Sequence, residues 1–111
     1  IDWSRPAAAI VNQLRALDPV PGARTGWRDK WLKLFRARLE HGPAAQPPGT
    51  VLEVRSGEGF AVAAGDGVIW VLEVQPAGGR RMSAADFVNG YRLQPGERLQ
   101  APVPPVRALG G

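Results

Sequence analysis

Hydrophobic residues near the start of the chain follow a helical period. Ile10, Leu14 and Leu17 recur at intervals of three or four residues, which places them on one face of a helix. Ser4, a residue type that caps helix N-termini, precedes this segment, and Pro19 follows it. We therefore predict a helix that begins just after Ser4 as its N-cap and ends before Pro19.

The hydrophobic pattern changes after residue 50. The segments "VLEV", "FAVAA" and "VIWVLEV" are rich in β-branched and aromatic residues, and the glycine-containing segments "RSGEG" and "GDG" separate them. This spacing predicts three antiparallel strands joined by hairpin turns. A phosphate-binding glycine loop would have to lead into a helix, whereas strands follow both turns here.

The last third of the chain predicts a short helix and a tail. In "MSAADFVNGY", Ser83 has the position of an N-cap and Asn89-Gly90 that of a helix end. Residues 101–111 contain three prolines and end in two glycines, a composition that disfavours a packed core. We predict one domain over residues 1–100, followed by a disordered Pro/Gly-rich tail.

The segment "GWRDKWLKLFRAR", residues 26–38, fits two structures. As a helix, it would place Trp31, Leu34, Phe35 and Leu39 on one apolar face. As a β-hairpin, it would turn near Asp29. Neither reading is excluded by the local pattern.

Composition narrows the functional classes. The chain of 111 residues carries a formal charge of +4, and six of its 14 basic residues fall between Arg24 and Arg38. A cluster of this kind makes a polyanion a plausible partner. The sequence has no cysteine, which excludes disulfides and thiolate metal ligands. No apolar run reaches the roughly 20 residues of a membrane helix, so we expect a cytoplasmic protein without a membrane partner.

The sequence offers no catalytic constellation. His41, the single histidine, precedes a Gly-Pro pair and has only Glu40 near it. Ser4, Ser56 and Ser83 fit caps and turns better than nucleophiles, since none has a base beside it. We therefore predict no catalytic residue, no metal site and no bound cofactor in this chain.

The basic residues remain the candidate site. A solvated surface explains many charge clusters, but this one contains only a single acid, Asp29, from Arg24 to Arg38. We expect Trp31 and Trp70 to lie in the core rather than to stack on bases. The candidate polyanion-binding residues are Arg24, Arg28, Lys30, Lys33, Arg36, Arg38, Arg80 and Arg81.

Several longer strings carry a family resemblance. "IDWSRPAAAIVNQLRALDPVPGA", "PGTVLEV", "VAAGDGVIWVLEVQPAGGRRMSAADFVNG" and "PGERL" are similar, in order and spacing, to the C-terminal domain of bacterial methionyl-tRNA formyltransferase. The resemblance implies a mainly β fold, a small five-stranded Greek-key barrel of the oligonucleotide-binding type, with an N-terminal helix and a short second helix. It also favours the hairpin, with strands over residues 23–28 and 31–40.

The resemblance further implies a function in translation initiation. Enzymes of this family transfer a formyl group from 10-formyltetrahydrofolate to the methionyl amino group of initiator tRNA. Their catalytic and folate-binding residues lie in an N-terminal domain that this sequence lacks, so we expect the chain, which starts at Ile1, to be an inactive piece of a longer enzyme. Its partners would be initiator methionyl-tRNA, held by the basic surface, and that N-terminal domain.

Two alternatives stay open. Related C-terminal domains occur in formyltransferases that act on sugar nucleotides or process formyltetrahydrofolate, where such a domain would be a packing module. An independent nucleic-acid binder of the same fold is the other alternative.

Overall fold

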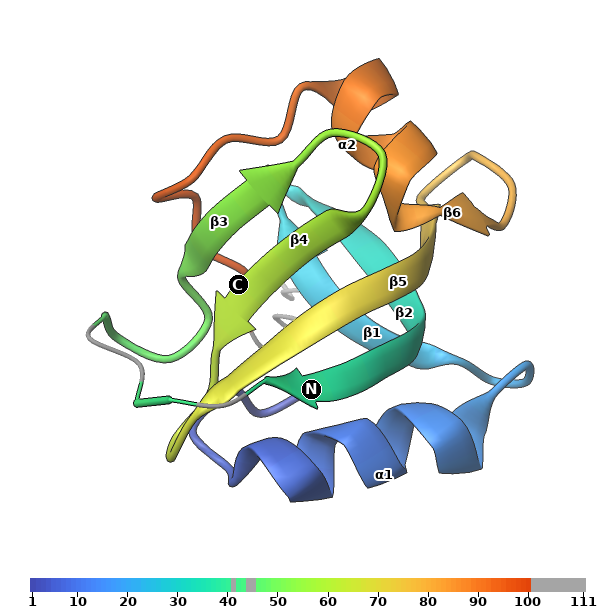
Figure 1. The fold of residues 1–111 in the computed structure, drawn as a ribbon. Coiled ribbons are helices and arrows are strands. Elements are labelled where there is room, and N and C mark those ends of the chain that lie inside the picture. Colours follow the sequence, from blue (N-terminus) through green and yellow to red (C-terminus); the bar gives the residue numbers. More distant parts are fainter. Residues whose placement is uncertain (41, 44–45, 101–111) are drawn as a thin grey trace, which may run out of the picture.

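A computed structural model describes residues 1–40, 42–43 and 46–100 of the protein. His41 and the predicted tail, residues 101–111, lie outside the described residues. The fold is mainly β, with one helix at each end of the sheet (Figure 1). The elements, in chain order, are α1 (Ala7–Leu17), β1 (Ala23–Trp27), β2 (Lys30–Glu40), β3 (Val51–Arg55), β4 (Gly59–Ala63), β5 (Val68–Pro76), β6 (Met82–Ser83) and α2 (Ala84–Tyr91).

The first helix forms where predicted, but Ser4 does not cap it. The N-cap residue is Pro6, and Ser4 instead bonds to Asp2, whose Oδ1 accepts from the Ser4 amide at 3.0 Å and the hydroxyl at 2.6 Å. The Ala7 amide donates to Asp66 Oδ1, 2.7 Å away in the turn between β4 and β5. The predicted Ser4 cap is therefore wrong, because a carboxylate distant in sequence satisfies this helical amide.

The turn between β4 and β5 needs glycine where it meets the start of α1. The Gly65 amide donates to the Arg5 carbonyl at 2.9 Å. A Cβ at Gly65 would lie 1.9 Å from the Ser4 carbonyl oxygen, which no side chain tolerates. The "GDG" segment is thus a hairpin turn, as predicted, and it also fixes the helix on the sheet.

Residues 23–40 form a β-hairpin, as the family resemblance implied. β1 and β2 pair antiparallel from Ala23 opposite Leu34 to Trp27 opposite Lys30. The two turn residues, Arg28 and Asp29, both have positive φ, 46° and 65°. This is the backbone of a tight two-residue hairpin turn, and the helical alternative for this segment is wrong.

The sheet has six strands and is open. Its order is β1-β2-β5-β4-β3, with β6 paired to β5, and β3, β4 and β5 form the predicted meander. No strand ladder joins β1 to β3 in the described part of the chain, so the expected five-stranded Greek-key barrel is corrected to an open six-stranded sheet. The two-residue strand β6 was too short to carry a sequence pattern.

A segment after α2 lies across the open side of the sheet. Gly26 in β1 and Gln100 exchange two backbone hydrogen bonds, of 2.5 and 3.0 Å. On the β3 side, the Leu99 amide donates to the Gly49 carbonyl and the Val51 amide to the Glu97 carbonyl. Residues 97–100 therefore bond to both edges without extending either into a ladder.

The core fills the concave side of this curved sheet. The pairing of β2 with β5 shifts register between Leu34 and Ala37 of β2. In β5, Val74 on one side of this irregularity is buried in the core, and so are Val71 and Ile69 on the other side. The residues that face the core therefore change from even to odd numbers along the strand. This bend lets one sheet surround the larger of its two hydrophobic clusters. α1 covers one end of the sheet and α2 the opposite end (Figure 1).

The second helix begins as predicted and ends slightly later. The Ser83 hydroxyl accepts from the Asp86 amide at 3.1 Å, which confirms its N-cap role. The helix passes the predicted stop at Asn89-Gly90 and ends at Tyr91, where Arg92 takes a left-handed conformation with φ of 54°. Buried Phe87 packs against Trp27, which fixes α2 on the sheet.

Candidate nucleic-acid interface

The β1–β2 hairpin gathers two predicted basic residues on its outer face. Arg24 is the cross-strand partner of Lys33, and Gly26 is the partner of Trp31. Successive residues of a strand point to opposite sides. Because Leu32 is fully buried in the core, its neighbours Trp31 and Lys33 are on the outer side.

The side chains of these two cations both lie over the Trp31 ring. The Arg24 guanidinium carbon is 4.8 Å from the centre of the indole ring, and Lys33 Nζ is 5.5 Å from it. Trp31 is only partly buried and does not belong to the core. The expectation that Trp31 is a core residue is therefore wrong, because Leu32 takes the inward position. Trp70, by contrast, is buried as expected, with 1% of its surface exposed.

The loop between β5 and β6 borders this outer face. The Ala77 amide donates to the Trp31 carbonyl at 3.1 Å, and Gln75, the partner of Lys33, donates from Nε2 to the Gly79 carbonyl at 3.1 Å. Arg80 follows in the same loop and is exposed. Arg80 therefore lies in a loop that borders the hairpin that carries Arg24 and Lys33.

Arg28 is already bonded within the protein. Its Nε and Nη2 donate to the two carboxylate oxygens of Glu97, each at 2.7 Å. Nη1 and Nη2 also donate to the Tyr91 and Arg92 carbonyls, at 3.0 and 3.1 Å, at the end of α2. The hydrogen bond from Arg28 lowers the pKa of Glu97, and burial opposes this effect. Arg28 thus ties the hairpin turn to the segment after α2.

Arg81 and Arg36 surround a pair of carboxylates. Arg81 binds both oxygens of Asp18, at 2.7 and 3.1 Å, and also donates to Glu73 Oε1 at 3.0 Å. Arg36 Nε lies 3.9 Å from the same Glu73 oxygen. The Arg81 hydrogen bond lowers the pKa of Asp18, and these carboxylates raise the pKa of Arg81. This cluster joins the segment after α1 to β5 and β6.

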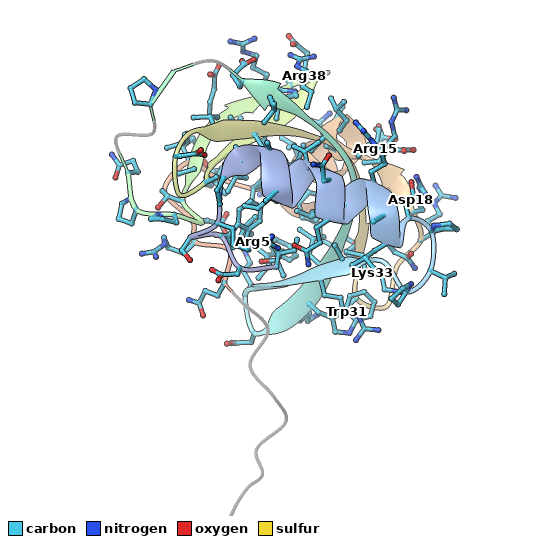
Figure 2. All side chains as sticks on the ribbon, turned by 90° about the horizontal axis from the view of Figure 1, so that it is seen from below. Arg5, Arg15, Asp18, Trp31, Lys33 and Arg38 are labelled. Atoms are coloured by element: carbon cyan, nitrogen blue, oxygen red, sulfur yellow. The ribbon has the colours of Figure 1, made fainter. Side chains whose placement is uncertain are left out.

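Lys30 and Arg38 lie away from the Trp31 face. Lys30 is exposed beside the hairpin turn, and Arg38 is exposed with its guanidinium carbon 5.7 Å from the Trp70 ring centre. Figure 2 shows Trp31 and Lys33 together on one side of α1 and Arg38 on the other. The eight predicted residues therefore form no single patch, and their role in RNA binding stays a prediction.

Sequence reasoning missed the acidic partners of the basic residues. Glu97 pairs with Arg28 across 69 positions of sequence, and Asp18 pairs with Arg81 across 63. Neither distance leaves a local spacing signal. Only the fold reveals which of the basic residues already have a carboxylate partner.

The described part of the chain was also searched for metal sites and membrane-spanning helices. No group of three or more His, Cys, Asp or Glu residues is placed there to hold a metal ion. None of its helices is long and apolar enough to cross a membrane. Ser56 lies in the turn after β3, as expected, with its hydroxyl 3.5 Å from Asn89 Oδ1.

Comparison with protein-family models assigns the chain to a family. Residues 1–92 match the family model described as "Formyl transferase, C-terminal domain". The chain belongs to this family. The match begins before α1 and ends just after α2, so it includes the hairpin and the whole sheet.

The similar curated proteins are bacterial methionyl-tRNA formyltransferases. The enzyme of Symbiobacterium thermophilum is 49% identical over 108 residues, which are 96% of this chain and 33% of that enzyme. The enzyme of Roseiflexus castenholzii is 51% identical over 102 residues, 89% of this chain and 31% of that enzyme. The chain thus spans about a third of the length of these relatives.

A solved structure shares the fold at lower identity. HypX from Aquifex aeolicus, crystallised in complex with tetrahydrofolic acid, superposes with a TM-score of 0.70 and 21% identity. The superposition covers 99% of this chain and 19% of HypX. This likeness supports the fold alone.

Proposed function

We propose that this chain is the tRNA-binding domain of a methionyl-tRNA formyltransferase and holds initiator methionyl-tRNA during translation initiation. The observation that carries the proposal is the identity of about half the residues, over nearly the whole chain, to enzymes of that name. Exposed cations on the hairpin and on the β5–β6 loop support it. Phosphate contacts from such side chains position an RNA without reading its sequence.

The chemistry belongs to a separate domain. An N-terminal domain of the same cytoplasmic polypeptide transfers the formyl group from 10-formyltetrahydrofolate to the methionyl amino group. The present chain contributes by holding the tRNA so that its acceptor end reaches that domain. The chain alone turns over no formyltetrahydrofolate with charged tRNA, and any turnover would contradict this division of work.

The eight basic residues contribute unequally. Arg24, Lys33, Lys30, Arg38 and Arg80 bind phosphates directly. The carboxylates of Glu97, Asp18 and Glu73 already partly neutralise Arg28, Arg81 and Arg36. These three shape the surface as much as they bind, because a phosphate would compete with an existing partner.

A salt series tests the proposal. Titration of the chain with initiator tRNA should give weak binding whose log K falls with log salt at a slope of about −3 to −5, from four to six phosphate contacts. Substitution of Arg24, Lys33 or Arg80 by Ala should flatten this slope by about one unit each.

Arg55→Ala is the matched control. Arg55 is also exposed, but it bonds to Glu53 and lies 3.7 Å from Glu58. It should therefore leave the slope unchanged. Absence of tRNA binding at low salt would reject the proposal and favour the packing module of a formyltransferase that acts on small molecules.

A further inference from the structure

We propose that Arg24, Trp31 and Lys33 form a subsite for one unpaired RNA nucleotide. The Trp31 indole stacks on the base, and the two cations bind the phosphates on either side of it. The inference rests on the proposed function, since it assigns to a tRNA-binding domain a contact with an unstacked base.

The first argument is the exposure of the ring. Trp31 is the one tryptophan of the four that is not buried, since Trp3, Trp27 and Trp70 have at most 5% of their surface exposed. An indole that stays partly exposed forgoes part of the free energy of burial. Core packing does not account for its place on the outer face, because Leu32 and Leu34 already fill the inner face.

The second argument is the position of the cations. Arg24 and Lys33 are a direct cross-strand pair, and both charged groups lie within 5.5 Å of the ring centre. A nucleotide carries its phosphate on the sugar that carries its base. A cation beside the indole is therefore within reach of the phosphate of a stacked nucleotide.

The third argument is the absence of competing acids. Neither Arg24 nor Lys33 makes an ion pair with any carboxylate in the described ranges. The strand partner Gly26 has no side chain, and the bordering Ala77 is uncharged. A phosphate would thus meet a partly exposed ring and two cations that have no carboxylate partner in the part of the chain that the structure describes.

Magnitudes favour the exchange of partners. An exposed cation–π contact is weaker than the stacking of a base on an aromatic side chain. When a phosphate draws Arg24 to the edge of the ring, the weaker contact is replaced by a stronger one. The same phosphate also gains a charge-assisted hydrogen bond.

The test compares unpaired and paired RNA on the complete chain. The probes are a single-stranded RNA octamer of mixed sequence and a blunt RNA duplex with a similar number of phosphates. Trp31→Ala should weaken octamer binding about 5- to 150-fold, the affinity equivalent of one stacked base. It should leave duplex affinity and the salt slope unchanged. Trp31→Phe should retain most of the octamer affinity.

Arg38→Ala is the matched control for the cations. Arg38 also lies against a tryptophan, but Trp70 is 1% exposed and cannot stack on a base. Arg24→Ala and Lys33→Ala should flatten the salt slope by about one unit and reduce the preference for the octamer. Arg38→Ala should not change that preference.

Three outcomes are decisive. A selective loss of octamer binding in Trp31→Ala, with recovery in Trp31→Phe, supports the subsite. If wild type, Trp31→Ala and Trp31→Phe bind the octamer equally and tRNA binding depends on salt, the subsite is rejected and the proposed function remains intact. Wild-type protein that binds none of the RNAs rejects both. Circular dichroism spectra of the variants exclude unfolding as the cause of a loss.

Discussion

Trp31 and Trp70 have similar charged neighbours but differ in how far their rings are accessible to solvent. Each ring lies against two cations, Arg24 and Lys33 for Trp31, and Arg38 and Arg55 for Trp70, at 4.8 to 5.7 Å from the ring centre. Trp70 is 1% exposed, while Trp31 is only partly buried. The residue types alone therefore do not determine which tryptophan a ligand can reach.

The difference comes from the strands beside each ring. Trp70 lies in β5 between β2 and β4, and Ala61, Leu52 and Leu72 pack around it. Trp31 lies in β2 near the hairpin turn, with Gly26 opposite. A central strand with apolar neighbours buries an indole on the outer face, whereas a neighbouring glycine leaves it accessible. The comparison predicts that Trp70 stabilises the fold and that Trp31 serves binding.

The largest expected effect is on stability. Trp70→Ala should lower the free energy of unfolding by about 3–5 kcal/mol, the usual cost of removing a buried aromatic side chain. Trp31→Ala should lower it by about 1 kcal/mol or less, because surface substitutions remove little packing. Urea unfolding followed by far-UV circular dichroism measures both. Equal losses in the two variants would show that Trp31 also supports the core.

A second test concerns two arginines that lie against aromatic rings. The Arg28 guanidinium carbon is 4.7 Å from the Trp27 ring centre and Arg28 also binds Glu97, whereas Arg24 beside Trp31 binds no described carboxylate. Arg28→Ala should destabilise the fold by about 1 kcal/mol, since the partly exposed pair is screened by water. Arg24→Ala should change stability by less than about 0.5 kcal/mol. The same urea titrations distinguish the two.

A third test measures the accessibility of the ring directly. Iodide should quench part of the tryptophan fluorescence more strongly than caesium does at the same ionic strength, because Arg24 and Lys33 attract the anion and repel the cation. Trp31→Phe should abolish this component. Trp70→Phe should leave it unchanged, since a buried ring is hidden from both quenchers. An iodide component that survives in Trp31→Phe would place the accessible indole elsewhere.

The sequence predicted local elements better than contacts between them. The sequence indicated the start of α2 at Ser83, because the Ser83 hydroxyl accepts a hydrogen bond from the amide of Asp86, only three residues away. The cap of α1 was missed because Asp66 is 59 residues from Ala7. The hairpin over residues 23–40 could not be distinguished from a helix by its pattern, and only the family resemblance favoured it.

The candidate site was predicted as a set of charges rather than as a surface. Basic residues are visible in any sequence, but the carboxylates that neutralise Arg28 and Arg81 come from distant segments. The exposure of Trp31 depends on which face of β2 it occupies, and a shift of one residue reverses that face. The register of β2 was thus the information needed to place Trp31, and no spacing of residues in 26–38 supplies it.

The smallest expected effect is on the pH dependence of stability, and it again separates Arg28 from Arg24. In the folded protein the hydrogen bond from Arg28 holds the pKa of Glu97 below its ordinary value. A carboxyl whose folded pKa is lowered contributes stability that is complete above its unfolded pKa, about 4.3 for Glu. This contribution is lost as the pH falls through the lowered folded value.

The stability difference between wild type and Arg28→Ala should therefore be constant above about pH 5 and shrink as the pH falls below about 4. The difference between wild type and Arg24→Ala should stay flat over the same range, because Arg24 has no carboxylate partner among the described residues. Other acids such as Asp18 titrate equally in both proteins of each pair, so their effects cancel. Thermal unfolding at closely spaced pH values measures the two differences. A pH-dependent difference for Arg24→Ala would reveal an acidic partner and remove the contrast between the two arginines on which the Trp31 subsite depends.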